Sequence, residues 1–318
     1  MSKTLRILVI GAGQIGSRHI QALASIPDVG EVVAVDPSPE SRERAALRWR
    51  DVPGHEGKRL SVVAGMDQVG GAGFDLAVLA TNAPGRLEHF RLVVALGIRY
   101  VLAEKLLFQS VAELEEALDL CRTAGVSLYP NYVYRYASPW RLLSDRLKGR
   151  PFEMRVVAGD IGLATNLPHW LDLFEFLAGF PLSELSIELT RPAYPSKRGG
   201  GLVDFSGSAA GRAGSGASLS LRFADGVGVP VVTIATADGD WILDEGASTI
   251  TGSLAESGMH LEMPMVSRIT ALAVPDILDG RTVLPDLFAT ASMNRLLLDA
   301  VGRALFGTVQ RDTIIPIT

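Results

Sequence analysis

The stretch RILVIGAGQIGSRHIQAL, residues 6–23, decides the fold of the first part of the chain. An apolar, strand-like run leads into a G-x-G-x-x-G spacing, and a helical pattern follows. In that context the first glycine permits a tight turn, the second lets a pyrophosphate approach the backbone, and the third lets the helix pack on the strand. We therefore predict a dinucleotide bound with its phosphates at the helix N-terminus. The predicted contact residues are Gly11, Gly13, Gln14, Ile15 and Gly16.

A carboxylate extends this prediction. Asp36 ends the next apolar strand, twenty residues after Gly16. At that position a carboxylate accepts hydrogen bonds from the hydroxyls of an adenosine ribose and repels a 2′-phosphate. The spacing favours NAD as the cofactor, whereas Arg42 and Arg44, close behind, leave NADP open unless they are only solvated helix charges. The alternative is a Rossmann fold that has lost its ligand.

Composition narrows the class of protein. The chain has 318 residues, a length typical of about two domains, with 47% hydrophobic and 20% charged residues. These values are typical of a globular protein with full hydrophobic cores. Because the formal net charge of −5 repels a phosphate backbone, we expect no nucleic-acid partner.

Several missing signals bear on location and on metal binding. We see no signal peptide, and no stretch approaches about 20 uninterrupted apolar residues, so no membrane partner is expected. The single cysteine, Cys121, cannot form an internal disulfide, which suits a reducing, cytoplasmic location. His55, His89 and His260 lack neighbours at a metal-ligand spacing, so we predict no metal site.

Residues 1–128 alternate short β-branched runs with helical patterns, which predicts an α/β Rossmann domain with a doubly wound parallel sheet. Its best-marked helix begins after Ser110, which has a capping-box spacing to Glu113, and ends before Gly125. The apolar stripe of this helix makes Cys121 a core residue. The predicted strands are 6–10, 32–36, 62–64, 76–80, 99–103 and 126–129.

Residues 129–318 follow a different pattern, with strand-like runs joined by Gly-rich and Asp-Gly turns. We predict an α+β domain for substrate binding and oligomerisation, built on an open, mainly antiparallel sheet. The glycine-rich segments 199–201 and 207–216 are interpreted as turns and bulges. The predicted helices are 138–147, 168–178 and a closing helix at 286–305, and the predicted strands are 152–158, 185–189, 202–206, 218–223, 229–235 and 241–243.

Polar residues follow the fourth and fifth predicted strands: Thr81 and Asn82 after one, Glu104 and Lys105 after the other. In an open parallel sheet, ligands bind at this carboxyl edge. Here the chain resembles the Gfo/Idh/MocA family of NAD(P)-dependent oxidoreductases, over essentially its whole length. That family carries the glycine motif, an Ala-Thr-Pro turn, a Glu-Lys-Pro motif and a histidine-bearing helix in its second domain. In this chain, Asn82 and Leu106 replace the two prolines.

The resemblance implies that Lys105 contacts both the nicotinamide region and the substrate hydroxyl, and that Thr81, Asn82 and Glu104 help to place the cofactor. A lysine suits this task, because positively charged oxidised nicotinamide lowers the pKa of a neighbouring ammonium and neutral reduced nicotinamide lets the proton return. Losing the proline at Leu106 is expected to relax the backbone after Lys105. The alternative is an exposed Lys–Glu pair at a strand end.

The family's catalytic histidine lies in a segment like Asp-x-x-x-His-x-x-Asp. The matching positions here are Thr165, His169 and Asp172, so the first acid is replaced by a threonine. A histidine suits proton exchange with a secondary alcohol, and Asp172, one turn further on, is expected to orient it. Thr165 and Asn166 are predicted to contact substrate. The alternative for His169 is a capped histidine without a catalytic role.

The segment YPNYVYRYASPW, residues 129–140, holds four of the six tyrosines. Tyrosine offers an apolar face to a sugar ring and a hydroxyl to its oxygens, and Arg135 can pair with a substrate carboxylate or phosphate. We predict that Asn131, Tyr132 and Arg135 bind substrate. The alternative is a strand and turn packed on the first domain.

Together these features predict an oxidoreductase that moves a hydride between NAD and a secondary alcohol or ketone of a sugar, with Lys105 and His169 handling the proton. Two alternatives stay open: a dinucleotide-binding sensor or partner protein, and an epimerase or lyase that returns the hydride to the same molecule. The resemblance is strongest to members that act in surface-polysaccharide pathways, which implies a nucleotide-activated or acidic sugar. It also implies a homodimer or homotetramer.

Overall fold

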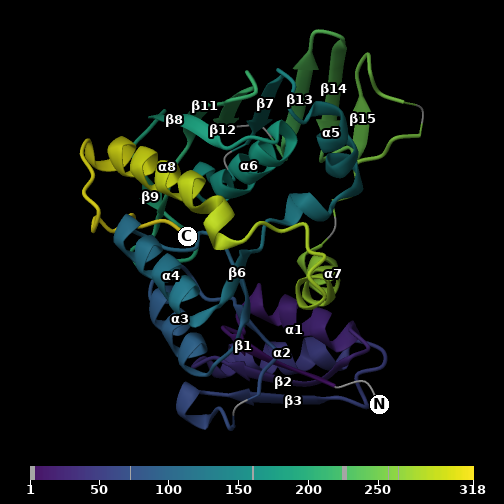
Figure 1. Ribbon diagram of the computed structural model, residues 1–318, viewed down its shortest axis with the longest axis vertical. Coiled ribbons are helices and arrows are strands. Elements are labelled where there is room, and N and C mark those ends of the chain that lie inside the picture. Colours follow the sequence, from purple (N-terminus) through teal and green to yellow (C-terminus); the bar gives the residue numbers. More distant parts are fainter. Residues whose placement is uncertain (1–3, 72, 160, 224–227, 257, 264) are drawn as a thin grey trace. The chain divides into compact units, whose positions relative to one another are not determined.

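The computed structural model describes residues 4–71, 73–159, 161–223, 228–256, 258–263 and 265–318. Within it the chain forms two compact units (Figure 1). The first unit comprises residues 1–108, 113–131 and 264–289, and the second unit comprises residues 109–112, 132–263 and 290–318. Each unit combines several segments of the chain, whereas the predicted domains are two continuous segments. The domain boundary between residues 128 and 129 therefore stays a prediction.

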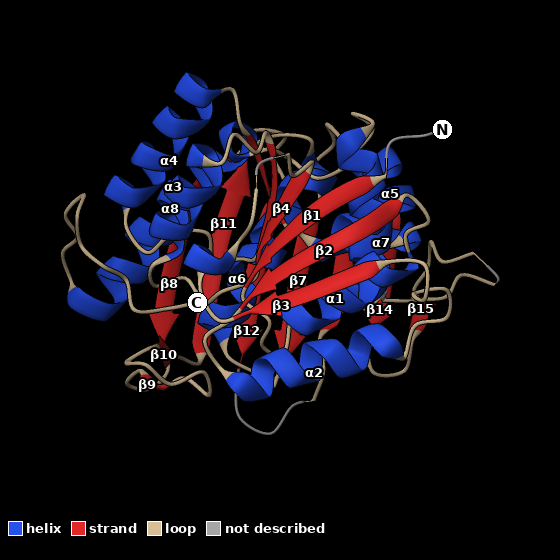
Figure 2. Cartoon of the chain, turned by 90° about the horizontal axis from the view of Figure 1, so that it is seen from below, coloured by secondary structure: helices blue, strands red, loops and turns tan. Residues whose placement is uncertain are grey.

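The first unit is built on a six-stranded, wholly parallel sheet with the order β3-β2-β1-β4-β5-β6. Its apolar, β-branched strands suit a sheet that is covered on both faces, as predicted. The strand order reverses between β1 and β4, which is where such sheets bind ligands. Figure 2 shows β3, β2 and β1 side by side. The strands are β1 (Leu5–Ile10), β2 (Val29–Val35), β3 (Arg59–Val63), β4 (Leu76–Leu79), β5 (Tyr100–Ala103) and β6 (Ser127–Pro130).

Right-handed crossovers place α1 and α2 on one face of this sheet and α3 and α4 on the other. The helices are α1 (Gly16–Ser25), α2 (Pro39–Arg50), α3 (Arg86–Ala95), α4 (Val111–Ala124) and α7 (Val266–Leu278). Helix α7, which was not predicted, packs against α1 although it lies far away in the sequence. Cys121 on α4 is buried as predicted, and burial raises the pKa of its thiol to about 12, so it is unreactive near neutral pH.

The second unit contains a seven-stranded sheet with the order β15-β14-β13-β7-β12-β11-β8. Only the β7–β12 pair is parallel among the described strands of this sheet, so the predicted mainly antiparallel sheet is confirmed. A separate pair, β9 with β10, precedes β11. The strands are β7 (Glu153–Ala158), β8 (Leu182–Leu189), β9 (Tyr194–Pro195), β10 (Val203–Asp204), β11 (Gly207–Ala213), β12 (Ser218–Phe223), β13 (Val231–Thr236), β14 (Gly239–Asp244) and β15 (Thr249–Thr251).

Helices α5 (Ser138–Leu147), α6 (Leu163–Ala178) and α8 (Leu287–Phe306) complete the fold. The sequence placed the bounds of α5 correctly, but α6 begins five residues earlier than expected. A proline is favoured in the first turn of a helix, and Pro168 was therefore read as the start. In the structure Pro168 lies inside α6.

The interpretation of 207–216 as turns and bulges was wrong, because Gly207–Ala213 forms strand β11 within the large sheet. Its small residues meet close neighbours: a Cβ on Gly211 would lie 2.8 Å from Leu182 Cδ1 and 2.9 Å from the Glu184 carbonyl oxygen. Close packing therefore selects small residues in this strand. The segment 199–201 is a turn as predicted, with positive φ at all three glycines.

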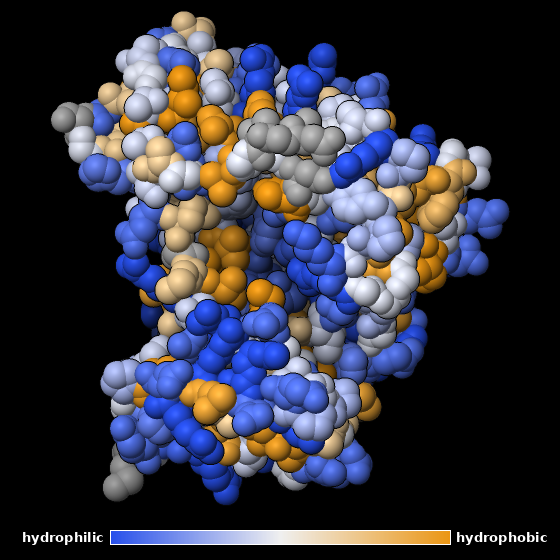
Figure 3. Space-filling model, turned by 180° about the vertical axis from the view of Figure 1, so that it is seen from behind, coloured by the Kyte–Doolittle hydropathy of each residue, from blue (hydrophilic) through white to orange (hydrophobic). Residues whose placement is uncertain are grey.

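The surface drawn in Figure 3 is hydrophilic over most of its area, with small hydrophobic groups in between. None of the helices in the described part of the chain is both long enough and apolar enough to cross a membrane.

Candidate cofactor and substrate sites

The glycines of the loop after β1 have separate structural tasks. Gly11 has a φ of +92°, and a Cβ there would lie 2.9 Å from the Ala80 carbonyl. A Cβ on Gly16 would lie 1.9 Å from the Gly11 oxygen. At Gly13, by contrast, a Cβ would meet nothing within 4 Å. Packing therefore requires glycine at the first and third positions, whereas the second faces open space.

That open space belongs to a cavity of about 450 Å³ inside the first unit. The cavity lies at the switch point of the parallel sheet, and no side chain caps the start of α1 beside it. The Thr81 hydroxyl and His89 Nδ1 are buried without a hydrogen-bond partner among the described residues. A cradle of backbone amides with spare donors and acceptors fits the phosphates and ribose of a dinucleotide. The lining residues are Ile10, Gly11, Gly13, Val35, Asp36, Pro37, Ala64, Gly65, Met66, Ala80, Thr81, Asn82 and His89.

Asp36 lines this cavity, and its contact with a ribose stays a prediction. Its Oδ2 accepts a hydrogen bond from the Ala12 amide at 2.7 Å, and its Oδ1 accepts one from the Ser38 amide at 2.9 Å. Each carboxylate oxygen can accept a second hydrogen bond, so the oriented carboxylate fits a ribose diol. Arg42 donates to the carbonyl oxygens of Asp36 and Pro37, at 2.8 and 2.9 Å. The guanidinium of Arg42 is therefore held against the backbone that follows β2.

The other two residues predicted in the glycine loop lie at the start of α1. Ile15 is the residue that precedes the helix, and it is half-buried. Gln14 is exposed, and its side-chain and main-chain oxygens accept hydrogen bonds from Arg48. Neither side chain lines the cavity, so contact with a cofactor would come from their backbone amides.

Sequence reasoning missed His89 as a residue of this cavity. Burial lowers the pKa of its imidazole, and the charge of Arg86 lowers it further, so the ring is neutral near pH 7. A neutral imidazole with an unpartnered nitrogen can accept a hydrogen bond from a bound ligand. The only signal in the sequence was its place on the helix that follows Thr81 and Asn82.

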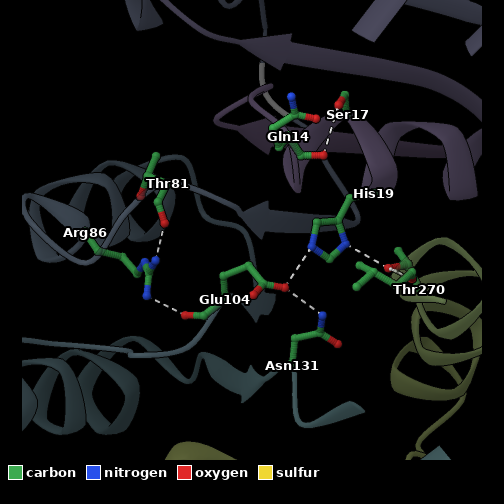
Figure 4. Close-up of polar contacts among 9 residues, drawn as sticks. Gln14, Ser17, His19, Thr81, Arg86, Glu104, Asn131 and Thr270 are labelled. Atoms are coloured by element: carbon green, nitrogen blue, oxygen red, sulfur yellow. Dashed lines mark hydrogen bonds and ion pairs between the residues drawn. The ribbon is translucent and has the colours of Figure 1, made fainter. Parts of the chain in front are cut away.

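Glu104 is the centre of a buried network in the first unit (Figure 4). Its Oε1 accepts hydrogen bonds from Asn131 Nδ2 at 2.7 Å and faces His19 Nε2 at 3.1 Å. The other nitrogen of His19 lies 2.7 Å from the hydroxyl of Thr270 on α7. Burial raises the pKa of Glu104, but His19, the Asn131 hydrogen bond and the charge of Lys105 outweigh it and bring the pKa to about 2. Glu104 is therefore ionised. The side-chain nitrogen of Asn131 holds this carboxylate, and its contact with substrate stays a prediction.

Arg86 holds the backbone around Lys105. Its buried guanidinium donates to the carbonyl oxygens of Thr81, Glu104 and Leu106 (Figure 4 draws the first two). Lys105 itself is buried, and the peptide bond between Lys105 and Leu106 is cis. The expectation that leucine in place of proline relaxes this backbone is therefore corrected, because a charged side chain ties down the carbonyls on both sides.

In the second unit, His169 lies half-buried on α6 among aromatic rings. Tyr132 and Tyr134 face it edge-on, with ring centroids 6.2 and 5.9 Å away. Burial raises the pKa of both tyrosine hydroxyls, so both are protonated at neutral pH. The structure thus brings together the histidine and one of the tyrosines predicted for the site, Tyr132.

Asp172 has a different partner from the one expected. Both of its carboxylate oxygens accept hydrogen bonds from Arg135, at 2.7 to 3.0 Å. Asp172 is fully buried, which raises its pKa, while Arg135 acts in the opposite direction. The guanidinium of Arg135, which was expected to bind a substrate anion, is thus engaged by Asp172. Asp172 in turn contacts Arg135 rather than His169.

Thr165 and Asn166 lie in the first turn of α6. The Thr165 hydroxyl donates to Asp204 Oδ2 at 2.6 Å, a contact that the sequence did not predict. Asn166 Nδ2 donates to the carbonyl oxygens of Ile161 and Gly162, at 3.0 and 2.8 Å. Nowhere in the described ranges do three or more His, Cys, Asp or Glu side chains gather as metal ligands would.

A parallel sheet with a glycine cradle at its switch point and an oriented carboxylate after β2 defines a dinucleotide-binding Rossmann protein. The profile of the oxidoreductase family with an NAD-binding Rossmann fold matches residues 5–132. Residues 5–132 are therefore similar to the NAD-binding Rossmann domain of the Gfo/Idh/MocA family.

Two relatives have established names. Inositol 2-dehydrogenase from Streptomyces avermitilis is 26% identical over 216 residues, which cover 63% of this chain and 60% of that protein. Inositol 2-dehydrogenase 3 from Saccharopolyspora erythraea is 29% identical over 143 residues, 45% of this chain and 40% of that protein. Each match spans less than two thirds of the relative.

Solved structures share the fold over nearly the whole chain. An oxidoreductase from Agrobacterium radiobacter in complex with NAD+, L-tartaric acid and magnesium has a TM-score of 0.72 at 15% identity, covering 96% of this chain and 97% of that one. The WlbA dehydrogenase from Bordetella pertussis in complex with NADH and UDP-GlcNAcA has a TM-score of 0.69 at 19% identity, covering 99% of both chains. At these identities the similarity establishes the fold alone.

Proposed function

We propose that this protein is an NAD-dependent dehydrogenase that acts on a secondary alcohol or ketone of a sugar-like substrate. The observation that carries the proposal is in the first unit, where an ionised Glu104 and a buried Lys105 follow β5 at the edge that also forms the dinucleotide cavity. A buried lysine held in place at this edge is suited to proton transfer beside a bound nicotinamide. The names of the curated relatives, both inositol dehydrogenases, support the same reaction class.

Each part of the proposed site has a separate role in this reaction. The glycine loop, Asp36, Thr81 and Asn82 bind and orient the cofactor, which when bound accepts or supplies the hydride. Lys105 holds or accepts the proton of the reacting oxygen at Nζ. The ionised carboxylate of Glu104 places a negative charge beside Lys105. His169 exchanges a proton with substrate from its aromatic surroundings in the second unit. Asp172 and Arg135 then hold the position of α6 and the tyrosine segment through their ion pair.

The finer substrate assignment is a nucleotide-activated or acidic sugar. UDP-N-acetylglucosamine 3-dehydrogenase GnnA from Acidithiobacillus ferrooxidans, with a TM-score of 0.67 at 18% identity, is among the proteins of similar fold and supports this assignment. We further propose a homodimer or homotetramer in a reducing, cytoplasmic setting. Light scattering at micromolar protein concentration tests the first point, and a monomer would contradict it.

One observation favours a second candidate. The ion pair between Arg135 and Asp172 occupies two side chains that a catalytic second unit would otherwise offer to substrate. A dinucleotide-binding sensor or partner protein would keep the cavity of the first unit while the polar groups of the second unit satisfy one another. Such a protein would bind NADH without turning over any alcohol. An epimerase or lyase that returns the hydride to the same substrate molecule would also release no reduced cofactor.

Fluorescence titration with NADH and NADPH, after removal of carried-over dinucleotide, tests the cofactor assignment. Tight NADH binding with at least about tenfold weaker NADPH binding is expected from Asp36. Absorbance of reduced nicotinamide is then followed with myo-inositol, L-tartrate, UDP-N-acetylglucosamine and its uronic acid. Turnover of any of these supports the dehydrogenase, binding without turnover supports the rival proteins, and failure to bind either dinucleotide contradicts all three.

A further inference from the structure

The second unit contains a cavity in which Thr165 is the one lining residue with a role predicted from the sequence. It has a volume of about 350 Å³ and lies beside the first turn of α6. Its lining comes from three segments: the turn that precedes α6, the β9 region and β10. The lining residues are Ile161, Gly162, Thr165, Tyr194, Ser196, Lys197, Arg198 and Asp204.

The floor of this cavity is a fixed hydroxyl–carboxylate pair. Asp204 is only 6% exposed, and it accepts hydrogen bonds from the Thr165 hydroxyl at 2.6 Å and from the amides of Ala164 and Phe205, both at 2.9 Å. A Cβ on Gly162 would lie 2.1 Å from Asp204 Oδ2, so only glycine permits this approach. A hydroxyl that donates to a carboxylate can still accept a hydrogen bond, and carboxylate oxygens accept several. The floor therefore suits the hydroxyl groups of a polyol.

Tyr194 provides the wall. The guanidinium of Arg191 lies over its ring, 4.7 Å from the centroid, and also donates to the Ser206 hydroxyl at 3.3 Å. This stacking limits the movement of the ring. A tyrosine held in this way presents an apolar surface next to a polar floor, which is the combination that a sugar ring contacts.

Two adjacent cations, Lys197 and Arg198, line the same cavity from the turn between β9 and β10. Both are exposed, and neither forms an ion pair with any described residue. The two positive charges exceed the single negative charge of Asp204. The carboxylate of Asp204 already accepts hydrogen bonds from Thr165, Ala164 and Phe205. Cations without internal partners beside a polyol floor are suited to an anionic group on the same ligand.

We propose that this cavity binds the acidic part of a sugar substrate: hydroxyls on Thr165 and Asp204, a ring against Tyr194, and a carboxylate or phosphate on Lys197 and Arg198. The inference rests on the proposed function, since it takes the ligand to be the substrate. It assigns a role in sugar binding to five residues outside the cofactor site, and two of them, Lys197 and Arg198, choose acidic over neutral sugars.

Isothermal titration calorimetry with four probes tests the anion contacts. D-Glucuronate and D-glucose 6-phosphate separate the carboxylate from the phosphate source, D-glucose lacks the charge, and inorganic phosphate lacks the ring. At least one charged sugar should bind the wild-type protein at least tenfold more tightly than D-glucose. The Lys197→Ala/Arg198→Ala double variant should lose that tenfold preference. The matched control Arg303→Ala, which removes an exposed cation on α8 of the same unit, should keep it.

Three results would overturn the proposal: no charged sugar binds better than D-glucose, the double variant retains the preference, or inorganic phosphate binds as well as the charged sugars. The last result would mean an ion site without a sugar site. Thr165→Val tests the floor, since it removes the hydroxyl at nearly constant volume. It should weaken every sugar probe at least threefold, whereas Thr165→Ser should restore binding, and unchanged binding in Thr165→Val would exclude the floor contact.

NADH affinity and dehydrogenase activity distinguish failure of this inference from failure of the proposed function. Lys197 and Arg198 lie in the second unit, so the double variant should bind NADH like the wild type. A working dehydrogenase without preference for charged sugars would refute only the cavity assignment. Loss of charged-sugar binding in the double variant of a protein without dehydrogenase activity would refute only the enzyme.

Discussion

The Glu104 network of the first unit and the α6 region of the second unit shift the pKa of buried carboxylates in opposite directions. In the first unit the pKa of Glu104 is brought to about 2 by His19, Asn131 and Lys105. In the second unit burial raises the pKa of Asp172, Glu175 and Asp204. The polar contacts of the first unit thus keep Glu104 ionised, whereas in the second unit burial favours the protonated form of the acids.

This difference separates groups ready for a ligand from groups that stabilise the fold. Thr81 and His89 line the first cavity with polar atoms that lack partners in the described residues. Asp172 and Arg135, by contrast, satisfy each other. Variants in each unit test this difference.

The largest effect is expected for Lys105→Met. Methionine keeps the length of the side chain and removes its proton, so kcat should fall by about 10²–10⁴ while the NADH Kd changes little. Steady-state kinetics and NADH titration on the same preparation give both quantities. Retained turnover would mean that the first unit does not supply the proton-transfer group, and the contrast between the units would lose its catalytic meaning.

The glycine loop offers the next largest effect and its own control. Gly16→Ala places a Cβ 1.9 Å from a backbone oxygen and should lower the free energy of unfolding by about 3 kcal/mol. Gly13→Ala meets nothing within 4 Å, so the protein without cofactor should unfold like the wild type, yet NADH should bind at least tenfold more weakly. Urea unfolding and NADH titration measure the two effects. Equal stability loss in both variants would show that Gly13 serves packing rather than a ligand.

Arg86→Met tests how the Lys105 segment is held. The change leaves buried carbonyl oxygens of Thr81, Glu104 and Leu106 without their charged donor, which should cost about 2 kcal/mol of stability. It should also lower kcat more than it raises KM, because Lys105 loses its position rather than its charge. Arg91→Met, which removes an exposed guanidinium five residues further along α3, is the control. Unchanged kcat in Arg86→Met would reduce Arg86 to a packing role.

The sequence predicted the first unit well, because its signals are local. Gly11, Gly16 and Asp36 lie within one strand–helix–strand segment, and parallel strands bring Thr81 and Glu104 to the same edge without further information. The strand set and the parallel sheet followed from the same reasoning. Helix α7 was not predicted, since its contact through Thr270 with His19 spans 251 residues of sequence.

Contacts in the second unit could not be predicted in the same way. Arg135 and Asp172 are 37 residues apart, and Thr165 and Asp204 are 39 apart, with no motif that links them. A charged residue in a sequence does not reveal whether its partner is a ligand or another side chain. Arg135 was therefore expected at a substrate anion, and Asp204 was not considered.

Glu175 gives the smallest effect and tests the second unit alone. Burial raises its pKa from an ordinary value of 4.5 to about 7, against a hydrogen bond from the Leu182 amide. Its contribution to stability is full below pH 4.5 and is lost as the pH rises to 7, because only the folded state then holds the proton. Glu175→Gln should match the wild type at pH 4.5 and exceed it by about 3 kcal/mol at pH 8, measured by urea unfolding. Glu188→Gln, at an exposed position of β8, should show no such crossover. If Glu175→Gln instead parallels the wild type at every pH, burial does not raise the pKa of Glu175, and the contrast between the units fails at this residue.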